Sequence, residues 1–492
     1  MIQGYLFDTL IDRDPDTLDY YGKMAESWTI SDDKLTITYK LRPGMTWSDG
    51  RPVTADDVVF SFETTMDKEI DAQRVASYLK DVESAKALDD LTVQFKFTKR
   101  YYKSLEVSGA GYFTLIPRHV YAYGPGKPIP DAKTFNGLRD KLVGCGPYVF
   151  EDWTAGQQIV IKRNEHYYGE RPYFDRVIFR IVPDDTASLQ MLKAQELDYM
   201  GLSSDQYIRV EDDRKFGANY RRLLYDAPSG YSYIAWNTRS PFFKDRRVRV
   251  AMTHLVPRER INERLFNGLL RVTTGPFWPG GEGVDVPLQY DRTIEPYPFD
   301  PAKALALLAE AGWRDTDGDG LLDKDGEPLV FDILLPSSSE AGLDICSAAK
   351  EEMAKVGVKM EIRQLEWTVF VMRLDERRYH AISLGWTGSI EGDPYQIWHS
   401  SSIENKGSNH VSFNNPESDR LIEAARLEFD RDKRNELYHK FHRLLHEEQP
   451  YTFLFSSRSR AAVHKRFQDV RTHVLGLDTK EWWTPPDLRL YK

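Results

Sequence analysis

A chain of 492 residues is longer than one hydrophobic core usually serves, so we expect two or three domains. Hydrophobic residues make up 41% of the chain and charged residues 29%, as in a globular protein. The net charge of −10 argues against nucleic acid or anionic lipid as a partner, because both favour an excess of lysine and arginine.

The beginning of the chain carries no recognisable export signal. Residues 1–8 have neither a basic stretch nor an apolar run, so export is not readable from this end. No stretch approaches the roughly 18 apolar residues of a membrane helix, so we expect a soluble protein. The two cysteines, Cys145 and Cys346, are expected as buried free thiols, with one disulfide as the alternative.

The first predicted elements are strands and one helix. Residues 28–47 alternate apolar and polar residues around an Asp-Asp turn, which predicts a hairpin. A helix follows, because Thr54 is a good N-cap and Asp56 and Asp57 lie in the first turn, where the helix dipole favours anions. Residues 91–97 alternate again and predict a strand.

A new unit is predicted to begin near the middle of the first half. Residues 144–150 and 158–163 predict two strands joined by a turn. Leucines at near-helical spacing follow in 186–200, and 233–237 predicts a short strand before a helix at 246–265.

The second half continues the alternation of strands and helices. Strands are predicted at 329–335 and 359–364, and amphipathic helices at 302–311 and 344–356. Residues 417–447 predict a long charged segment of two helices. This order predicts mixed α/β domains with connected sheets.

Histidines recur at helical spacing in the last of these helices. His439, His442 and His446 fit a metal-binding stripe, but a charged helix more often presents such residues to water. We therefore expect a solvated helix face.

Residues 41–61, L-R-P-G-M-T-W-S-D-G-R-P-V-T-A-D-D-V-V-F-S, closely resemble a signature of the extracytoplasmic peptide- and nickel-binding proteins of ABC importers, bacterial solute-binding protein family 5. The resemblance covers about residues 5 to 475. Further matches follow in the family's order: G-C-G-P-Y at 144–148, R-N-E-H-Y-Y at 163–168, F-K-D-R-R-V-R at 243–249, G-W-T-G at 385–388, Asp393-Pro394, N-P-E-S-D at 415–419 and D-K-R at 432–434.

The resemblance implies a periplasmic-binding-protein-like α/β fold of class II (cluster C), with two lobes, a hinge, a central cleft and an extra α+β domain. Mapped onto this chain, the extra domain is 8–140, lobe I is 1–7, 141–235 and 456–492, and lobe III is 236–455. Family members have a signal peptide and a strand before the segment matched here by 5–11, so the first strand of lobe I is expected to be missing.

The same resemblance implies function. The chain is expected to be the substrate-binding component of an ABC transporter, which captures oligopeptides in the interlobe cleft outside the cytoplasm and delivers them to a membrane permease driven by ATPase subunits. We expect a monomer, no nucleic-acid partner and no enzyme. An oligosaccharide or another small solute, or a chemosensory role, is the alternative. The S-x-x-K spacing at 347–350 lacks the partner motifs of penicillin-recognising enzymes.

In peptide-binding relatives an aspartate that pairs with the ligand ammonium follows the run matched by 385–388. This chain has Ser389 there, which supplies no charge. Glu391 and Asp393 are candidates to replace it, and a turn role is the alternative for Asp393. The position of the carboxylate-binding arginine of dipeptide-specific relatives holds Ser-Ser-Ser-Glu at 337–340, which argues against strict dipeptide specificity. A longer peptide held by main-chain hydrogen bonds is compatible with this, and so is a neutral ligand such as an oligosaccharide.

The predicted ligand-binding residues lie mainly around this run and among nearby aromatic side chains, whose flat faces suit variable ligands; ordinary core packing is the alternative for each. They are Trp386, Thr387, Gly388, Ser389, Asp393, Tyr233, Trp236, Asn237 and Trp398. Trp386 is the strongest of them, and Trp367 lies in a further segment that lines the cleft in the family.

An Asp-rich loop is the only candidate for a cofactor. Asp315, Asp317, Asp319 and Asp323 occupy positions 1, 3, 5 and 9 of an EF-hand-like calcium loop, but Gly326 stands where the bidentate glutamate belongs. A weak calcium site is one interpretation, and an Asp/Gly-rich turn is the favoured one.

Overall fold

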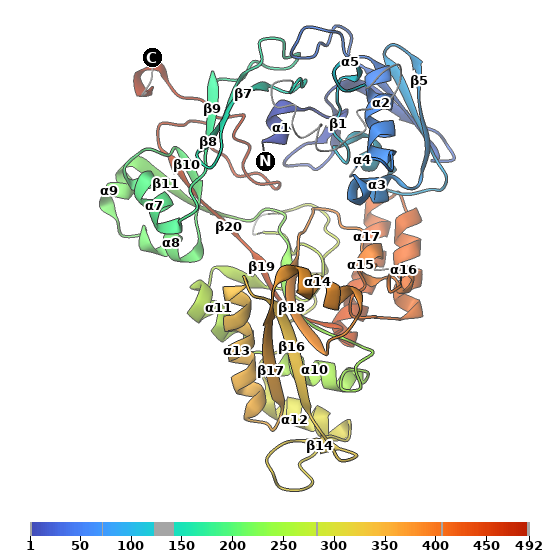
Figure 1. The fold of residues 1–492 in the computed structure, drawn as a ribbon, viewed down its shortest axis with the longest axis vertical. Coiled ribbons are helices and arrows are strands. Elements are labelled where there is room, and N and C mark those ends of the chain that lie inside the picture. Colours follow the sequence, from blue (N-terminus) through green and yellow to red (C-terminus); the bar gives the residue numbers. More distant parts are fainter. Residues whose placement is uncertain (1, 71, 123–141, 282–283, 405–406, 490–492) are drawn as a thin grey trace. The chain divides into compact units, whose positions relative to one another are not determined.

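The computed structural model of the chain describes residues 2–70, 72–122, 142–281, 284–404 and 407–489. They group into two compact units (Figure 1): unit 1 comprises residues 1–198, 465–473 and 477–492, and unit 2 comprises 199–464 and 474–476. The mixed α/β fold predicted from the order of elements is confirmed.

The domain limits inferred from the family stay predictions. Residues 8–122 and 142–198 share unit 1, and 199–235 group with unit 2. Residues 123–140 of the predicted extra domain, and residue 141, lie outside the described residues.

A four-stranded antiparallel sheet in unit 1 contains the predicted hairpin. The strand order is β3 (Ala25–Ile30), β4 (Thr36–Leu41), β6 (Thr92–Phe97) and β5 (Val82–Asp89). Helix α2 (Ala55–Met66) packs on β5 and β6. It begins where predicted: the Asp57 carboxylate accepts a hydrogen bond from the Thr54 backbone N–H at 2.9 Å.

The first residues of unit 1 explain the G-C-G-P-Y motif. A Cβ on Gly144 would lie 2.0 Å from the Leu6 carbonyl oxygen, and one on Gly146 would lie 2.5 Å from that of Tyr5. The backbone N–H of Gly146 donates to the Leu6 carbonyl at 2.9 Å. Both glycines are therefore required by the close approach of the N-terminal segment.

The remaining elements of unit 1 include the three-stranded sheet β7-β8-β9. Their bounds are α1 (Gln3–Leu6), β1 (Ile11–Arg13), β2 (Tyr20–Gly22), α3 (Gln73–Leu79), α4 (Ser104–Gly109), α5 (Arg118–Tyr121), β7 (Tyr148–Thr154), β8 (Gln158–Arg163), β9 (Arg176–Arg180), α7 (Asp185–Lys193) and η3 (Pro486–Leu488).

Unit 2 is built on a six-stranded sheet, shown in the lower part of Figure 1. The order is β13 (Leu270–Val272), β19 (Tyr451–Ser457), β12 (Tyr231–Trp236), β18 (Ala381–Trp386), β16 (Val330–Pro336) and β17 (Lys359–Leu365). Strands β16, β17 and β18 are parallel to one another, while β12 and β19 are antiparallel to their neighbours.

Helices cover this sheet and smaller elements surround it. The helices are α10 (Arg246–His254), α11 (Arg258–Phe266), α12 (Pro301–Glu310), α13 (Glu340–Ala354), α14 (Trp367–Asp375), α15 (Tyr395–Trp398), α16 (Pro416–Leu427) and α17 (Arg431–Glu448). The smaller elements are β10 (Tyr199–Gly201), α8 (Ser204–Arg209), α9 (Arg214–Asn219), β11 (Tyr220–Tyr225), β20 (Ser459–His464), β14 (Asp323–Lys324), β15 (Glu327–Pro328) and η2 (Ser400–Ser402).

One predicted helix proved to be two. The segment 246–265 breaks between α10 and α11, and Pro257 is the N-cap of α11. Proline has no backbone N–H and clashes with the preceding turn, so a helix does not run through it undisturbed.

The prediction of a solvated face for the histidines of α17 was wrong. His442 is fully buried; its Nδ1 accepts from the Asp291 backbone N–H at 3.1 Å, and its Nε2 lies 3.0 Å from the Thr274 hydroxyl. Burial lowers the pKa of His442 to about 3. Neutral imidazole thus serves as a core side chain with both nitrogens satisfied.

Both cysteines are buried free thiols, as predicted, and burial raises the pKa of Cys145 to about 12 and that of Cys346 to about 11. Among the described helices, none is both long enough and apolar enough to cross a membrane.

Candidate functional site

The parallel strands of unit 2 end at one edge of the sheet. Residues Pro336, Leu365 and Trp386 are the last of β16, β17 and β18, and the register places these carboxyl ends side by side. We call this the carboxyl edge. In open α/β sheets ligands bind outside the carboxyl ends of the strands, so this edge is the first place to examine.

Two glycines bring another segment close to this edge. Tyr231, the first residue of β12, lies opposite Trp386. A Cβ on Gly230 would lie 1.8 Å from the Trp386 carbonyl oxygen, and one on Gly388 would lie 2.1 Å from that of Ser229. The backbone after β18 therefore runs directly over the backbone before β12.

Trp386, the strongest of the predicted site residues, is partly exposed at the rim of the core. Its Nε1 lies 3.4 Å from the Tyr451 hydroxyl, and its ring is parallel to that of His410, with centroids 5.9 Å apart. Burial, and then Arg377, lower the pKa of His410 to about 4, so the imidazole is neutral near pH 7. Trp386 thus has a fixed orientation.

Three further predicted residues follow Trp386 and are exposed: Thr387, Gly388 and Ser389. The Ser389 hydroxyl donates to the Glu391 carbonyl at 2.9 Å. The segment offers main-chain groups and hydroxyls, and no charge.

The two carboxylates considered as replacements for an ammonium partner are already in ion pairs. Asp393 pairs with Arg426 at 3.0 Å and accepts from the Tyr395 backbone N–H at 3.1 Å, at the start of α15. Glu391 pairs with Arg434 at 3.0 Å. This geometry supports the turn role for Asp393.

Tyr233 and Trp398 are buried beneath this region. Tyr233 stacks on Tyr451 with ring centroids 4.1 Å apart, and Trp398 packs against Tyr451 at 4.5 Å. Neither ring has more than a trace of exposed surface. They support the residues above them from within the core, which corresponds to the packing alternative.

Trp236 and Asn237 lie at the other end of β12. Trp236 is opposite Ala381, the first residue of β18, and its Nε1 donates to the Thr452 hydroxyl at 3.0 Å. The Asn237 side-chain amide donates to the carbonyls of Tyr379 at 2.8 Å and Arg377 at 3.1 Å. The structure does not bring these two residues together with Trp386.

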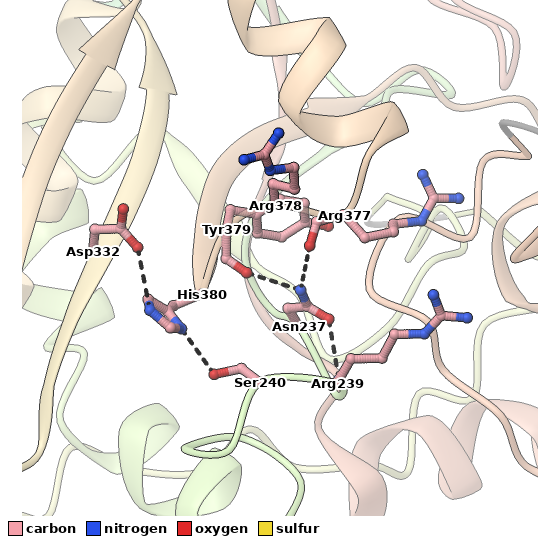
Figure 2. A pocket seen from close by; sticks show the side chains of 8 residues that line it. All are labelled: Asn237, Arg239, Ser240, Asp332, Arg377, Arg378, Tyr379 and His380. Carbon is pink, nitrogen blue, oxygen red and sulfur yellow. Dashed lines mark hydrogen bonds and ion pairs between the residues drawn. The ribbon is translucent and has the colours of Figure 1, made fainter. Parts of the chain in front are cut away.

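A pocket of about 360 Å³ opens beside Asn237 (Figure 2). The side chains that line it follow β12, precede β18 or lie on β16: Asn237, Arg239, Ser240, Asp332, Arg377, Arg378, Tyr379 and His380. Arg377 donates to the carbonyls of Ile403 and Gly407, and Arg239 pairs with Glu404, so these arginines hold a neighbouring loop.

Ser240, His380 and Asp332 form a row in this pocket that has the composition of a hydrolytic triad (Figure 2). The Ser240 hydroxyl lies 3.0 Å from His380 Nδ1, but the distance from His380 Nε2 to the Asp332 carboxylate is 3.9 Å. That separation is longer than a hydrogen bond, so the carboxylate does not orient the imidazole as nucleophilic catalysis requires.

Helix α14 adds apolar surface next to the carboxyl edge. Trp367 is 54% exposed and Met372 is 47% exposed, while Phe370 and Leu374 face the core. Trp367 had been noted from the sequence, but Met372 had not. The signal that could have found it is the apolar composition of α14 on both faces, which exceeds what one buried face needs.

The Asp-rich loop has converging carboxylates. Oxygens of Asp315, Asp317 and Asp323 lie within 4.8 Å of one another, and these side chains are largely exposed. Asp315 accepts from the Gly318 backbone N–H at 2.7 Å, and Asp323 from that of Thr316 at 2.8 Å. The fourth residue, Asp319, accepts from the Leu321 backbone N–H at 2.7 Å. These bonds hold the turn without an ion, and calcium binding stays a prediction.

Comparison with known proteins places this chain in a class. Residues 19–408 match the bacterial extracellular solute-binding proteins, family 5. The oligopeptide-binding protein AppA of Bacillus subtilis is 30% identical over 98% of this chain and 87% of its own length. Its structure with a nonapeptide has a TM-score of 0.79 at 29% identity and covers 98% of this chain and 94% of that one.

Other relatives have different ligands in their names. Heme-binding protein A of Haemophilus influenzae is 29% identical over 96% of this chain and 85% of its own length. NikA of Brucella suis, solved with Fe(III)-EDTA, has a TM-score of 0.82 at 22% identity, with 98% of this chain and 95% of that chain covered, and shows the fold alone.

The class is thus a solute-binding protein of the ABC-importer type. The chain belongs to family 5 of the bacterial extracellular solute-binding proteins, as its sequence motifs indicated.

Proposed function

We propose that this chain captures oligopeptides at the carboxyl edge of unit 2 and delivers them to the permease and ATPase subunits of an ABC importer outside the cytoplasm. The work is recognition, so we expect no turnover of the ligand, and we expect the protein to act as a monomer.

The observation that carries this proposal is the uncharged polar character of the segment that follows Trp386 at the carboxyl edge. Thr387, Gly388 and Ser389 are exposed and neutral, and Glu391 and Asp393 are already neutralised by arginines. Such a surface suits a ligand held through main-chain hydrogen bonds, as an extended peptide is when it adds to a sheet edge.

Aromatic and apolar side chains beside the edge support the same ligand class. Trp386 has a fixed ring orientation, and Trp367 and Met372 are exposed. Flat aromatic faces and flexible methionine accept many side chains without requiring one sequence. The similarity to AppA, whose structure holds a nonapeptide, also supports an oligopeptide.

The mechanism in this proposal is a two-state equilibrium. The hinge closure inferred from the family is part of it: a ligand that contacts the closed form better shifts the population toward that form, and the permease receives it from there.

A thermal-shift experiment tests the ligand class. The purified protein is heated with mixed nonapeptides, with cello- and xylo-oligosaccharides, and with metal ions with and without chelator. Binding to the native state raises the melting temperature, so we expect a shift with peptides alone. A shift with sugars or metals and none with peptides would refute the oligopeptide assignment while leaving the family assignment intact.

A further inference from the structure

We infer that an arginine cluster adjoining the carboxyl edge, formed by Arg271, Arg458 and Arg460, binds a carboxylate group of the ligand. The inference rests on the proposed function, because it assigns one part of the peptide to one part of unit 2.

The cluster adjoins the carboxyl edge through strands β13 and β19. Arg271 lies opposite Ser456, and Arg458 follows β19 directly. The Ser229 hydroxyl donates to the Ser457 carbonyl at 2.8 Å, and Ser229 precedes the glycine that packs on Trp386. The arginines and Trp386 therefore belong to one continuous edge.

Two of the arginines share a single carboxylate. Asp226 Oδ2 lies 2.9 Å from Arg271 Nη2, and Asp226 Oδ1 lies 3.4 Å from Arg458 Nε. Only 11% of the Asp226 side chain is exposed, so these two pairs use most of its surface. One negative charge thus faces two positive charges, and the group retains an excess of one.

Arg460 adds a further positive charge. It lies on β20, opposite Leu224 and two residues beyond Arg458, which stands between β19 and β20. Its Nε donates to the Leu202 carbonyl at 3.2 Å, and among the described residues its Nη1 has no hydrogen-bond partner. Burial, and then the charge of Arg458, lower the pKa of Arg460.

The uncompensated charge makes this a binding site for an anion. A partly buried guanidinium without a carboxylate is unfavourable for folding, and its retention is explained when a ligand supplies the missing charge. Carboxylate fits best within the proposed ligand class, because the guanidinium fork matches both of its oxygens.

The dimensions of the sheet fit a peptide. Strands β19 and β18 are two positions apart in the sheet order. Adjacent strands lie about 4.8 Å apart, so the end of β19, which Arg458 follows, and the end of β18 at Trp386 are separated by about 10 Å, which about three extended residues span. A peptide of this length or longer can place a carboxylate at the arginines and a side chain on Trp386.

The carboxylate has two sources, the peptide terminus or an acidic side chain, and four random nonapeptide libraries distinguish them. Two libraries carry free carboxyl termini and two carry carboxamides, and one of each pair omits Asp and Glu. Their dissociation constants are measured by calorimetry for the wild type, Arg460→Gln and the control Arg209→Gln. Arg209 is exposed and pairs with Asp205 within α8.

We expect the wild type to bind a carboxylate-bearing library about tenfold more tightly than its matched neutral library. Of the two libraries without Asp and Glu, tighter binding of the one with free carboxyl termini identifies the peptide terminus as the source of the carboxylate. Of the two carboxamide libraries, tighter binding of the one that contains Asp and Glu identifies an acidic side chain as the source. Arg460→Gln should reduce either preference to about twofold, and Arg209→Gln should retain it.

Equal binding of all four libraries by the wild type overturns the inference and leaves the proposed function standing. No binding of any library contradicts the proposed function, and the inference falls with it. The melting temperature of each ligand-free variant separates a structural role: we expect Arg460→Gln to leave it unchanged or to raise it. A drop of several degrees, with equal weakening for acid and amide libraries, would overturn the inference.

Discussion

The two ends of strand β18 lie in one sheet but differ in chemistry. At its end, Trp386 leads into an exposed neutral segment that glycines hold against the start of β12. At its beginning, Asn237 and Arg377 fix loops through bonds to backbone carbonyls. The difference teaches that one strand pair leads into an exposed, uncharged segment at one end and fixes neighbouring loops through side-chain bonds to backbone carbonyls at the other.

The largest expected effect is at the close approach beside Trp386. Gly230→Ala places a Cβ 1.8 Å from the Trp386 carbonyl oxygen, so the backbone must shift, at a cost of about 3 kcal/mol in the free energy of unfolding. Urea unfolding measures it. Gly217→Ala is the control, because a Cβ there meets nothing within 4 Å. Equal stability of the two variants would contradict the claim that position 230 requires glycine.

A substitution at the opposite end of β12 should lower the stability of the protein and leave its peptide affinity unchanged. Asn237→Ala leaves the Tyr379 and Arg377 carbonyls without their donor, and we expect a loss of about 2 kcal/mol in unfolding free energy. Peptide affinity of the folded variant should equal that of the wild type. A selective loss of affinity with normal stability would restore Asn237 to the binding site.

Acid pH should destabilise the fold through His410, which contacts residues from both ends of β18. His410 stacks on Trp386, and Arg377 Nη1 lies 3.4 Å from its Nδ1. Its folded pKa of about 4 is below the ordinary value of 6.5, so the unfolded state binds the proton more readily. The contribution is present above pH 6.5 and is lost as the pH falls toward 4.

The variant His410→Phe keeps an aromatic ring but does not titrate. Between pH 7 and pH 4.5 the unfolding free energy should fall by about 2 kcal/mol less for this variant than for the wild type. His442 and His446 also have lowered pKa values, of about 3 and about 4, and remain in both proteins, so the comparison isolates His410. An identical pH dependence of the two proteins would refute the assignment of this loss of stability to His410.

The variant Trp386→Ala tests whether the end of β18 that leads into the uncharged segment binds peptide. Removing the ring should weaken peptide binding about tenfold, because an aromatic contact contributes about 1 kcal/mol beyond its buried area. Calorimetric titration with mixed nonapeptides measures this, and Trp153→Ala in unit 1 is the control, since that tryptophan is exposed and lies outside the proposed site. Unchanged affinity would remove Trp386 from the site.

The smallest effect is expected at Asp393. Because its carboxylate pairs with Arg426 and accepts from the Tyr395 backbone N–H, Asp393→Asn should cost about 1 kcal/mol of stability or less. Peptide affinity should be the same at low and at high salt. A loss of affinity that is larger at low salt would instead show that Asp393 meets a cationic group of the ligand.

Much of the fold was predictable because it depends on local patterns. The hairpin at 28–47, the cap at Thr54 and the strands of unit 2 followed from alternation and capping residues. The histidines of α17 were not predictable in this way. Whether one face of a charged helix is solvated depends on what packs against it, and Thr274 and Tyr290 come from distant parts of the chain.

The candidate site was predicted in part. The family motifs predicted Trp386 to Ser389 as ligand-binding residues. The resemblance also predicted Trp236 and Asn237, but these lie at the end of β12 that is far from Trp386, because β12 and β18 are antiparallel. Arg271, Arg458 and Arg460 gave no signal, because arginines on strands are common and only the fold shows which of them share one carboxylate.

By itself, the sequence determined the family, the mixed α/β class and most of the strands and helices, since periodicity, capping and motif spacing are properties of neighbouring residues. Only the tertiary structure decided which end of β18 leads into an exposed, uncharged segment, which carboxylates are already paired and which arginines are left in excess. Burial and charge balance are set by residues that are far apart in the chain.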